Sequence, residues 1–499
     1  MKRLASPFVP PITIEGNHKR PIYRQLYDWF RAAIAEGRLR PGERLPSTRS
    51  LASELKVSRI SVFNAYEQLQ SEGYLETFAG SGTCVASAIP DDSFNPSTLF
   101  RGRSQRPNCE SVPRKVSRRA RALSKLSSEP WLKSLGPFRV SLPALDHFPL
   151  NVWSKLVARH SREQSRAIMA YGGGLGYLPF REAIATYLGT FRGVRCDASQ
   201  VLVTSGSQQA LQISAQALLD PGDQVLFEEP GYPGARLAFA SAGVQVTPIA
   251  VDDDGLLTPK ITGRHRLGRV AYVTPSHQYP LGMTMSGARR MSLLKWAIDS
   301  ESWIFEDDYD SEFRFASRPI ASLQGLDSHG RVIYIGTFSK VLFPALRLGY
   351  LVVPKDLVPA FAAVRDALDI FSPTLYQAVL ADFIREGYFA RHIRKMRMLY
   401  MERRKTLVNA IRNHMHGLLE VIGDDAGMHL VALLPHNIDD VEVSKEASRN
   451  AISAMPLSSC YMTPPKRGGL ILGYGGVSPR QIQEATLKLA PIVKRCAQS

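Results

Sequence analysis

Three reactive side chains stand just after apolar runs in the second half of the chain. Lys340 ends the segment GTFSK, which follows the apolar run 332–335, and Asp307 and Tyr309 belong to EDDY, which follows the run 303–305. Such runs predict buried strands, and ligand sites of α/β sheets collect at the ends of strands. We therefore expect an amine, a carboxylate and a phenol to share one site.

An anion also has candidate donors. The segment SGSQQ (205–209) separates the apolar run 201–203 from a predicted helix, so its backbone N–H groups would converge on an anion at the helix N-terminus. Arg347, seven residues after Lys340, would add a charge-assisted hydrogen bond. The predicted donors are Gly206, Ser207, Gln208, Thr337, Ser339 and Arg347.

Together these groups meet the needs of pyridoxal 5′-phosphate (PLP). This cofactor requires an amine for a Schiff base, a carboxylate facing its pyridinium nitrogen, donors for its phosphate and a planar group over its ring. Lys340 would form the Schiff base, Asp307 would pair with N1, Tyr309 would donate to the 3′-oxygen, and Tyr232 of EEPGYP would stack on the ring. A lone lysine is more often a solvated surface charge, so the prediction depends on the combination.

Strand-like runs alternate with helical segments over residues 136–499. The strand-like runs are 201–203, 224–227, 244–249, 270–273, 303–305, 332–335 and 348–353, and segments such as 208–219 and 289–298 have helical periodicity. A long helical region, 373–413, leads into a smaller mixed segment. This order predicts an α/β domain with a mostly parallel sheet.

Residues 1–88 predict a small α+β domain. Helices are expected over 21–34 and from the N-cap residues Ser47 and Ser58, followed by strands at 74–78 and 82–86 around a Gly-Ser-Gly tip. A helix-turn-helix needs short polar residues and cations where its second helix begins. Ser58, Arg59, Ser61 and Asn64 supply them, although a helical packing module with solvated arginines is the alternative.

Residues 89–135 predict a linker. This stretch lacks sustained periodicity and carries ten Lys and Arg residues against four Asp and Glu. A solvated tether is the simpler interpretation, and a tether that also contacts DNA phosphates is the alternative.

Composition narrows the class of protein. A chain of 499 residues exceeds one core, and a formal charge of +17 favours a polyanionic partner such as nucleic acid. Five scattered cysteines without a C-x-x-C spacing argue against disulfide frameworks and metal sites. No secretion signal and no run of 18 uncharged apolar residues is present, so a cytoplasmic protein without a membrane partner is expected.

The segment LPSTRSLASELKVSRISVFNAYEQLQSEGYLETFAGSGTCV (45–85) resembles the GntR-type winged helix-turn-helix. The resemblance implies that Arg49 and Arg59 contact the DNA backbone or base edges. It also implies that the recognition helix is fixed by Ser58 and Ser61 and that the wing near Gly82 approaches the minor groove. Ser47 belongs to the entry of this motif.

The order of motifs over about 140–480 resembles the fold-type I aminotransferases. With the winged helix in front, the chain resembles the MocR/GabR-type transcription regulators, which YGGGLGYLPFREAIATYL, EEPGYPGAR, TPSHQYPLG, EDDYDSEFRF and GTFSKVLFPALRLGYLV also match. Such proteins form homodimers, and Tyr171 would reach a phosphate in the partner subunit.

Two positions depart from the aminotransferase pattern. Where those enzymes have an asparagine before Pro-Thr-Gly, this chain has HQYPLG, so His277 or Gln278 is expected to bond the 3′-oxygen instead. Where they have an arginine for the substrate carboxylate, this chain has Ile471, and Arg467 would substitute only in a different strand register. A ligand without a carboxylate, or PLP itself, is then a reasonable effector.

The sequence thus predicts a PLP-dependent regulator that binds double-stranded operator DNA and senses a small amine, an amino acid or PLP. An active class I/II aminotransferase with an attached DNA-binding module is the alternative. A third hypothesis is a DNA-packaging protein with an inactive enzyme domain. The lysine and phosphate motifs argue against it. The sequence leaves open the effector, the operator and the direction of regulation.

Overall fold

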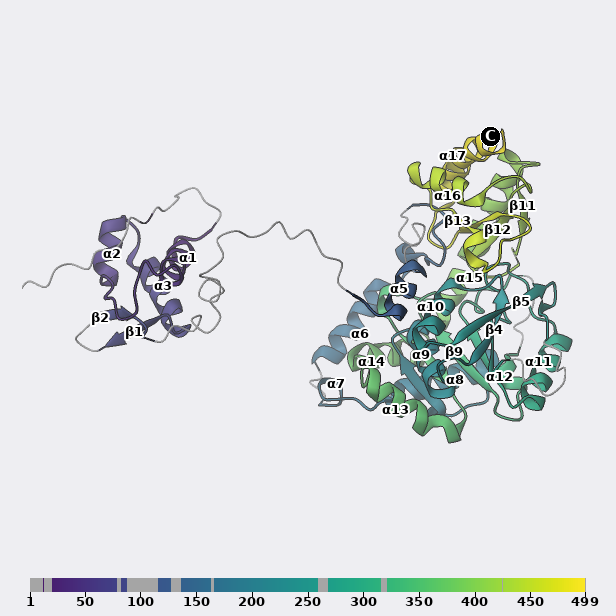
Figure 1. Ribbon diagram of the computed structural model, residues 1–499, viewed down its shortest axis with the longest axis horizontal. Coiled ribbons are helices and arrows are strands. Elements are labelled where there is room, and N and C mark those ends of the chain that lie inside the picture. The colour runs from purple at the N-terminus through teal and green to yellow at the C-terminus, as the bar shows by residue number, and fades with distance from the viewer. Residues whose placement is uncertain are drawn as a thin grey trace, which may run out of the picture. The chain divides into compact units, whose positions relative to one another are not determined.

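The computed structural model describes residue 12 and residues 20–78, 82–87, 115–126, 136–162, 166–258, 268–315, 321–423 and 425–498. The chain forms two compact units that divide between Lys115 and Val116 (Figure 1). Each unit has its own hydrophobic core, so each is described by itself.

The N-terminal unit is a three-helix domain with a two-stranded hairpin. Its elements are α1 (Ile22–Ala35), α2 (Thr48–Leu55), α3 (Arg59–Ser71), β1 (Leu75–Phe78) and β2 (Gly82–Val85). The apolar faces of α1 and α3 meet in a core where the rings of Phe30 and Tyr66 pack edge to face at 5.4 Å. The hairpin is antiparallel, as predicted, whereas Gly80 and Ser81 of the predicted tip lie outside the described residues.

The second unit contains an eight-stranded sheet in the order β3-β10-β9-β8-β7-β4-β5-β6. Strands β9, β8, β7, β4 and β5 are parallel, and β10 runs antiparallel to both of its neighbours. The predicted mostly parallel sheet is therefore confirmed. The strands are β3 (Val201–Thr204), β4 (Gln224–Glu229), β5 (Gln245–Asp252), β6 (Gly255–Leu256), β7 (Val270–Val273), β8 (Trp303–Asp308), β9 (Val332–Thr337) and β10 (Gly349–Val352).

The second unit also contains helices before, between and after these strands, as expected when parallel strands are connected. They are α6 (Leu150–Arg162), α7 (Arg166–Met169), α8 (Leu178–Arg192), α9 (Ser207–Leu218), α10 (Pro233–Ala242), α11 (Gly287–Asp299), α12 (Leu323–Leu326), α13 (Val358–Leu368) and α14 (Thr374–Arg385). The long helical region predicted over 373–413 is two helices, α14 and α15 (Tyr388–His414). Gly387, at a φ of +76°, separates them.

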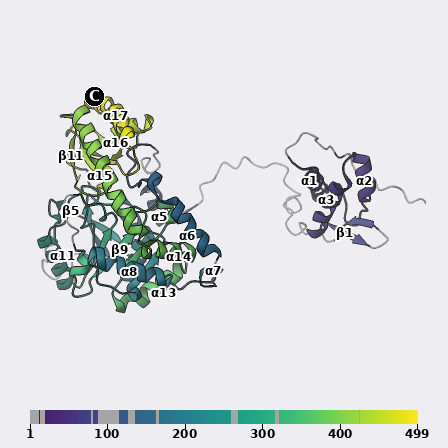
Figure 2. The ribbon, with the colours of Figure 1, turned by 180° about the vertical axis from the view of Figure 1, so that it is seen from behind.

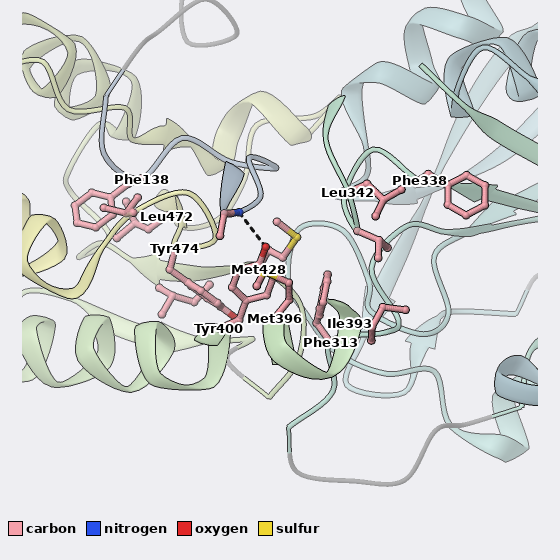
Figure 3. Close-up of a cluster of buried hydrophobic side chains, with 14 of the residues drawn as sticks. Phe138, Phe313, Phe338, Leu342, Ile393, Met396, Tyr400, Met428, Leu472 and Tyr474 are labelled. Atoms are coloured by element: carbon pink, nitrogen blue, oxygen red, sulfur yellow. Dashed lines mark hydrogen bonds between the residues drawn. The ribbon is translucent and has the colours of Figure 1, made fainter. Parts of the chain in front are cut away.

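A smaller sheet follows, in the order β11-β12-β14-β13. Its elements are β11 (Glu420–Ile422), β12 (His429–Leu433), α16 (Asp440–Arg449), β13 (Met455–Pro456), β14 (Gly469–Gly473) and α17 (Pro479–Gln498). Figure 2 shows α15 running between the large sheet and this smaller one. One core joins them: Phe338 follows β9, Tyr400 lies on α15 and Leu472 on β14, and the Ala144 amide donates to the Tyr400 hydroxyl at 3.0 Å (Figure 3).

In the described part of the predicted linker, residues 115–126, lies the helix α5 (Arg118–Leu126), which contacts α10. A Cβ on Gly243 would lie 3.1 Å from a guanidinium nitrogen of Arg119, so this arginine packs closely on the end of α10. The segment is short and strongly basic, which hid its helical character in the sequence. Because α5 belongs to the second unit, that unit begins earlier than the predicted boundary at residue 136.

Candidate functional site

A cavity of about 120 Å³ opens where β8 and β9 end. Both strands run further than predicted, β8 to Asp308 and β9 to Thr337, and Asp307 and Thr337 line the cavity. The lining residues are Ser141, Ser207, Gln208, Tyr232, Tyr272, Thr274, Tyr279, Asp307, Tyr309, Thr337, Ser339, Lys340, Pro344 and Arg347.

Nine of the residues predicted to bind the cofactor line this one cavity. They are Ser207, Gln208, Tyr232, Asp307, Tyr309, Thr337, Ser339, Lys340 and Arg347. Gly206 lies beside Arg347, and His277 lies behind Tyr309. Tyr171 is 87% exposed, with its ring centre 6.2 Å from that of Phe371, and does not line the cavity.

Lys340 is the candidate nucleophile. Burial lowers its pKa from 10.5 to about 8, although the negative charges of Asp310 and Asp307 oppose the shift and Arg347 adds to it. An amine with this pKa is partly neutral near pH 7, and the neutral form attacks carbonyl carbons.

Asp307 faces the cavity from β8 with one carboxylate oxygen unused. The Tyr272 hydroxyl donates to Oδ2 at 2.8 Å, whereas the buried Oδ1 has no hydrogen-bond partner among the described residues. Burial raises the pKa of Asp307 to about 7, and the hydrogen bond from Tyr272 opposes this rise. A ligand with a cationic N–H at this point would satisfy Oδ1 and restore the ionised form.

The other end of the cavity suits an anion. Arg347 adopts a left-handed backbone, at a φ of +51°, and its guanidinium donates to the Ser205 carbonyl at 2.7 Å. A Cβ on Gly206 would lie 3.2 Å from two guanidinium nitrogens, so glycine leaves the room that the arginine occupies. Helix α9 begins at Ser207, and the first N–H groups of a helix lack intrahelical acceptors and favour anions.

His277, Asp310 and His429 form a buried cluster behind Tyr309. Their potential ligand atoms lie within 4.8 Å of one another, a spacing that a metal ion would accept. Hydrogen bonds use some of these atoms: His277 Nδ1 is 3.1 Å from both Asp310 oxygens, and His429 Nε2 is 3.1 Å from the Pro280 carbonyl. Nε2 of His277 is buried and has no hydrogen-bond partner among the described residues.

The segment HQYPLG is arranged differently from the prediction. Gln278 donates to the carbonyl oxygens of Pro230 at 2.8 Å and Tyr279 at 2.7 Å and does not line the cavity. Tyr279 does line it. In the aminotransferase pattern the asparagine directly precedes the proline, and here Tyr279 directly precedes Pro280. Matching the two prolines would therefore have identified Tyr279.

Tyr272 was also missed, because a tyrosine within the strand-like run 270–273 looks like an ordinary core residue. Its pairing with Asp307 depends on two neighbouring parallel strands, β7 and β8, and their register. The sequence carries no direct signal for this contact.

The position of the expected carboxylate-binding arginine is apolar. Ile471 is fully buried on β14, opposite Val431 and Met455. Arg467 lies before this strand, where it donates to the Leu434 carbonyl and to Glu420, both at 2.6 Å. Arg467 therefore does not replace the missing arginine at the cavity.

In the N-terminal unit, the predicted serines cap helices. The Ser47 hydroxyl accepts from the Ser50 amide at 3.1 Å, and Ser58 accepts from the Ser61 amide at 3.2 Å. Arg49, Arg59, Asn64 and Gly82 are exposed. The caps thus fix α2 and α3, and the arginines and asparagine remain available to a partner.

Ile60 and Phe63 are exposed large apolar residues on α3 that sequence reasoning did not single out. They are 66% and 47% exposed, on the helix that carries Arg59 and Asn64. Apolar side chains on a recognition helix can contact thymine methyl groups.

Each of the two units matches a known protein family. The family model described as "Aminotransferase class I and II" matches residues 141–485, and "Bacterial regulatory proteins, gntR family" matches residues 22–85. A probable rhizopine catabolism regulatory protein MocR from Rhizobium meliloti is 40% identical over 93% of this chain and 92% of its own length. The chain belongs to the MocR-type transcription regulators. The predicted family and fold are thereby confirmed.

Other relatives of this MocR-type chain include a second regulator and aminotransferases. The pyridoxine biosynthesis regulator PdxR of Corynebacterium glutamicum is 31% identical over 93% of this chain and 94% of its own. A kynurenine aminotransferase from Pyrococcus horikoshii, solved in complex with PMP, is 26% identical with a TM-score of 0.66, covering 80% of this chain and 98% of its own. Among the described residues, no helix is long and apolar enough to cross a membrane.

Proposed function

We propose that this MocR-type regulator binds PLP on Lys340 and changes its affinity for operator DNA when a small molecule engages that cofactor. The observation that carries the proposal is the pairing, in one cavity, of a half-buried lysine with a buried acid whose Oδ1 has no hydrogen-bond partner among the described residues. When bound, PLP supplies an aldehyde for a lysine amine and an electron-withdrawing ring.

The residues present fit this cofactor. Asp307 Oδ1 would accept from the pyridinium N–H, and Tyr309 would donate to the 3′-oxygen. Arg347 and the start of α9 would hold the phosphate, and Tyr232 offers a ring to stack on the cofactor. Lys340, with its lowered pKa, would attack without a strong external base.

Reductive trapping tests the proposal. Purified protein incubated with PLP and borohydride should gain the mass of one covalent adduct, located on Lys340 by peptide mapping, and Lys340→Ala should gain none. Lys355→Ala is the matched control, because Lys355 is 69% exposed and pairs with Asp197 outside the cavity. Undiminished labelling of Lys340→Ala would refute the assignment.

We further propose that the effector is an amine without an α-carboxylate. The cationic side chains that line the cavity are Lys340 and Arg347, and bound PLP would engage both. A buried carboxylate without a cation to pair with is costly. Titration with matched pairs, isoamylamine against leucine and ethanolamine against serine, should change the cofactor's absorbance at lower amine than amino-acid concentration. Equal responses, or turnover with 2-oxo acids, would favour the aminotransferase alternative.

DNA would be bound by the N-terminal unit in the cytoplasm, with the protein acting as a homodimer. Arg49, Arg59 and Asn64 would contact DNA, Ser47, Ser58 and Ser61 would fix the two helices, and the wing at Gly82 would follow the minor groove. Tyr171, exposed on the second unit, would reach the partner's phosphate site. Sedimentation of the PLP-bound protein with and without operator DNA tests the stoichiometry: a monomer on DNA would contradict it.

A further inference from the structure

A chain of hydrogen-bonded groups leads from the core to the cavity through His277. Its Nδ1 lies 2.9 Å from the Tyr309 hydroxyl oxygen and 3.1 Å from both carboxylate oxygens of Asp310. The side chains of His277 and Asp310 are only 1% and 2% exposed, whereas Tyr309 lines the cavity. Tyr309 therefore contacts this buried pair on one side and the cavity on the other.

The acceptors around His277 decide where its proton lies. An ionised carboxylate can only accept hydrogen bonds, and Nδ1 of His277 lies within hydrogen-bonding distance of both Asp310 oxygens. A proton on Nδ1 satisfies this buried charge, and it prevents Nδ1 from accepting the Tyr309 hydrogen. The phenol oxygen then accepts a share of the Nδ1–H, and the phenol's own hydrogen is free to point into the cavity.

We propose that Asp310 and His277 are positioning residues that hold Tyr309 as a hydrogen-bond donor toward the cavity. This inference rests on the proposed function, because the acceptor would be the 3′-oxygen of PLP. A phenol that accepts a hydrogen bond is a stronger donor. A bond donated to the 3′-oxygen withdraws negative charge that would otherwise hold a proton on Nζ of Lys340, so the arrangement favours the deprotonated nitrogen.

Other charges near His277 must be separated from this effect. His429 faces it with ring centres 5.2 Å apart, and burial together with the neighbouring His277 lowers the pKa of His429 to about 3, which keeps it neutral. Two further charged groups, Asp307 and Lys340, line the cavity. The charge of Asp310 also raises the pKa of Lys340 directly, so a variant could act without involving Tyr309.

Two replacements of His277, each made with and without Tyr309→Phe, isolate the path through the phenol. His277→Ala removes the Nδ1 donor, and His277→Asn places an amide nitrogen near the position of Nδ1, where it can donate to Asp310 and Tyr309. The measurement is a pH titration of the visible absorbance of PLP bound to the full-length protein, which reports the protonation of Nζ without requiring turnover.

We expect His277→Ala to raise the apparent pKa by about one unit, the equivalent of one hydrogen bond, and His277→Asn to restore most of the difference. In the Tyr309→Phe background the same replacement should shift the pKa by less than about 0.3 unit, since groups that act through one another are not additive. Asp310→Asn, whose amide can donate to Nδ1, replaces His277→Ala if that variant does not fold. Because it also removes a charge that raises the pKa of Lys340, the expected result is a pKa change that is more positive when Tyr309 is present than in the Tyr309→Phe background.

Equal pKa shifts with and without Tyr309→Phe would mean that the charge of Asp310 acts directly on Lys340. That result would overturn the inference. The absence of a pKa shift in the protein that keeps Tyr309 would overturn it as well. A wild-type protein that shows no visible band after PLP is added would instead refute the proposed cofactor site, so the two failures are distinguishable.

Discussion

Asp307 and Asp308 are adjacent carboxylates on β8 with different surroundings, so replacing each by asparagine should separate cofactor binding from folding. Asp307 faces the cavity with Oδ1 unpartnered. Asp308 accepts from Nε of Arg192 at 2.8 Å and from the Tyr334 hydroxyl, and both members of its ion pair are at most 4% exposed. We predict that Asp307→Asn stabilises the PLP-free protein but weakens PLP binding, and that Asp308→Asn destabilises the protein.

The magnitude for Asp307 follows from its pKa. Burial raises this pKa from 3.8 to about 7, so between these values the folded protein retains a proton that the unfolded chain has lost. Ionisation therefore penalises folding increasingly from about pH 4 to about pH 7 and by a constant amount above. Three pKa units correspond to at most about 4 kcal/mol. The free energy of unfolding of Asp307→Asn should therefore be roughly 2–4 kcal/mol higher than that of the wild type at pH 8. Near pH 4 the two free energies should be equal.

Asp308→Asn has the opposite sign because it removes the negative charge from the buried Asp308–Arg192 ion pair. Breaking one side of a buried ion pair costs about 3–5 kcal/mol. For PLP, Asp307→Asn should weaken binding by about 10- to 100-fold, since a hydrogen bond to a charged group contributes about 1.5–3 kcal/mol, whereas Asp308→Asn protein that folds should keep its affinity.

Urea unfolding of the PLP-free protein at pH 5 and pH 8, followed by tryptophan fluorescence, measures the first effect. An absorbance titration with PLP measures the second. If Asp307→Asn lowered the midpoint at pH 8 as much as Asp308→Asn does, the burial argument would be wrong. Unchanged PLP affinity in Asp307→Asn would mean that this carboxylate does not face the pyridinium nitrogen.

Three further results are expected. Lys340→Ala should lose borohydride-trapped PLP completely by mass spectrometry, and retained adduct would exclude this lysine. Arg59→Ala should weaken operator binding in gel shifts by about 1–3 kcal/mol while PLP absorbance is unchanged, and full binding would remove α3 from the DNA surface. Neutralising Arg118, Arg119 and Arg121 on α5 should leave the salt dependence of DNA binding unchanged, whereas phosphate contacts would reduce its slope by roughly one per contact.

Local chemistry made much of the site predictable. Lys340 and Asp307 each stand near the end of a strand-like run, and parallel strands place their carboxyl ends at one edge of the sheet. Arg347 stands before the run 348–353, and it reaches the same edge because β10 is antiparallel, with Gly349 opposite Thr337 at the end of β9. Order along the chain was therefore enough to expect them together, and the structure brings them to one cavity. In the N-terminal unit, capping serines and helical periodicity determined α2 and α3 in the same way.

The sequence by itself thus determined the order of elements, the two units and the strand-end residues, because these depend on short-range periodicity and on chain direction. Only the tertiary structure decided which side chains face one another. Tyr272 meets Asp307 across two strands, His277 lies behind Tyr309 and not in the cavity, and Tyr279 takes the cavity position instead. Such contacts depend on strand register and on the path of a loop, which are fixed by packing among residues distant in sequence.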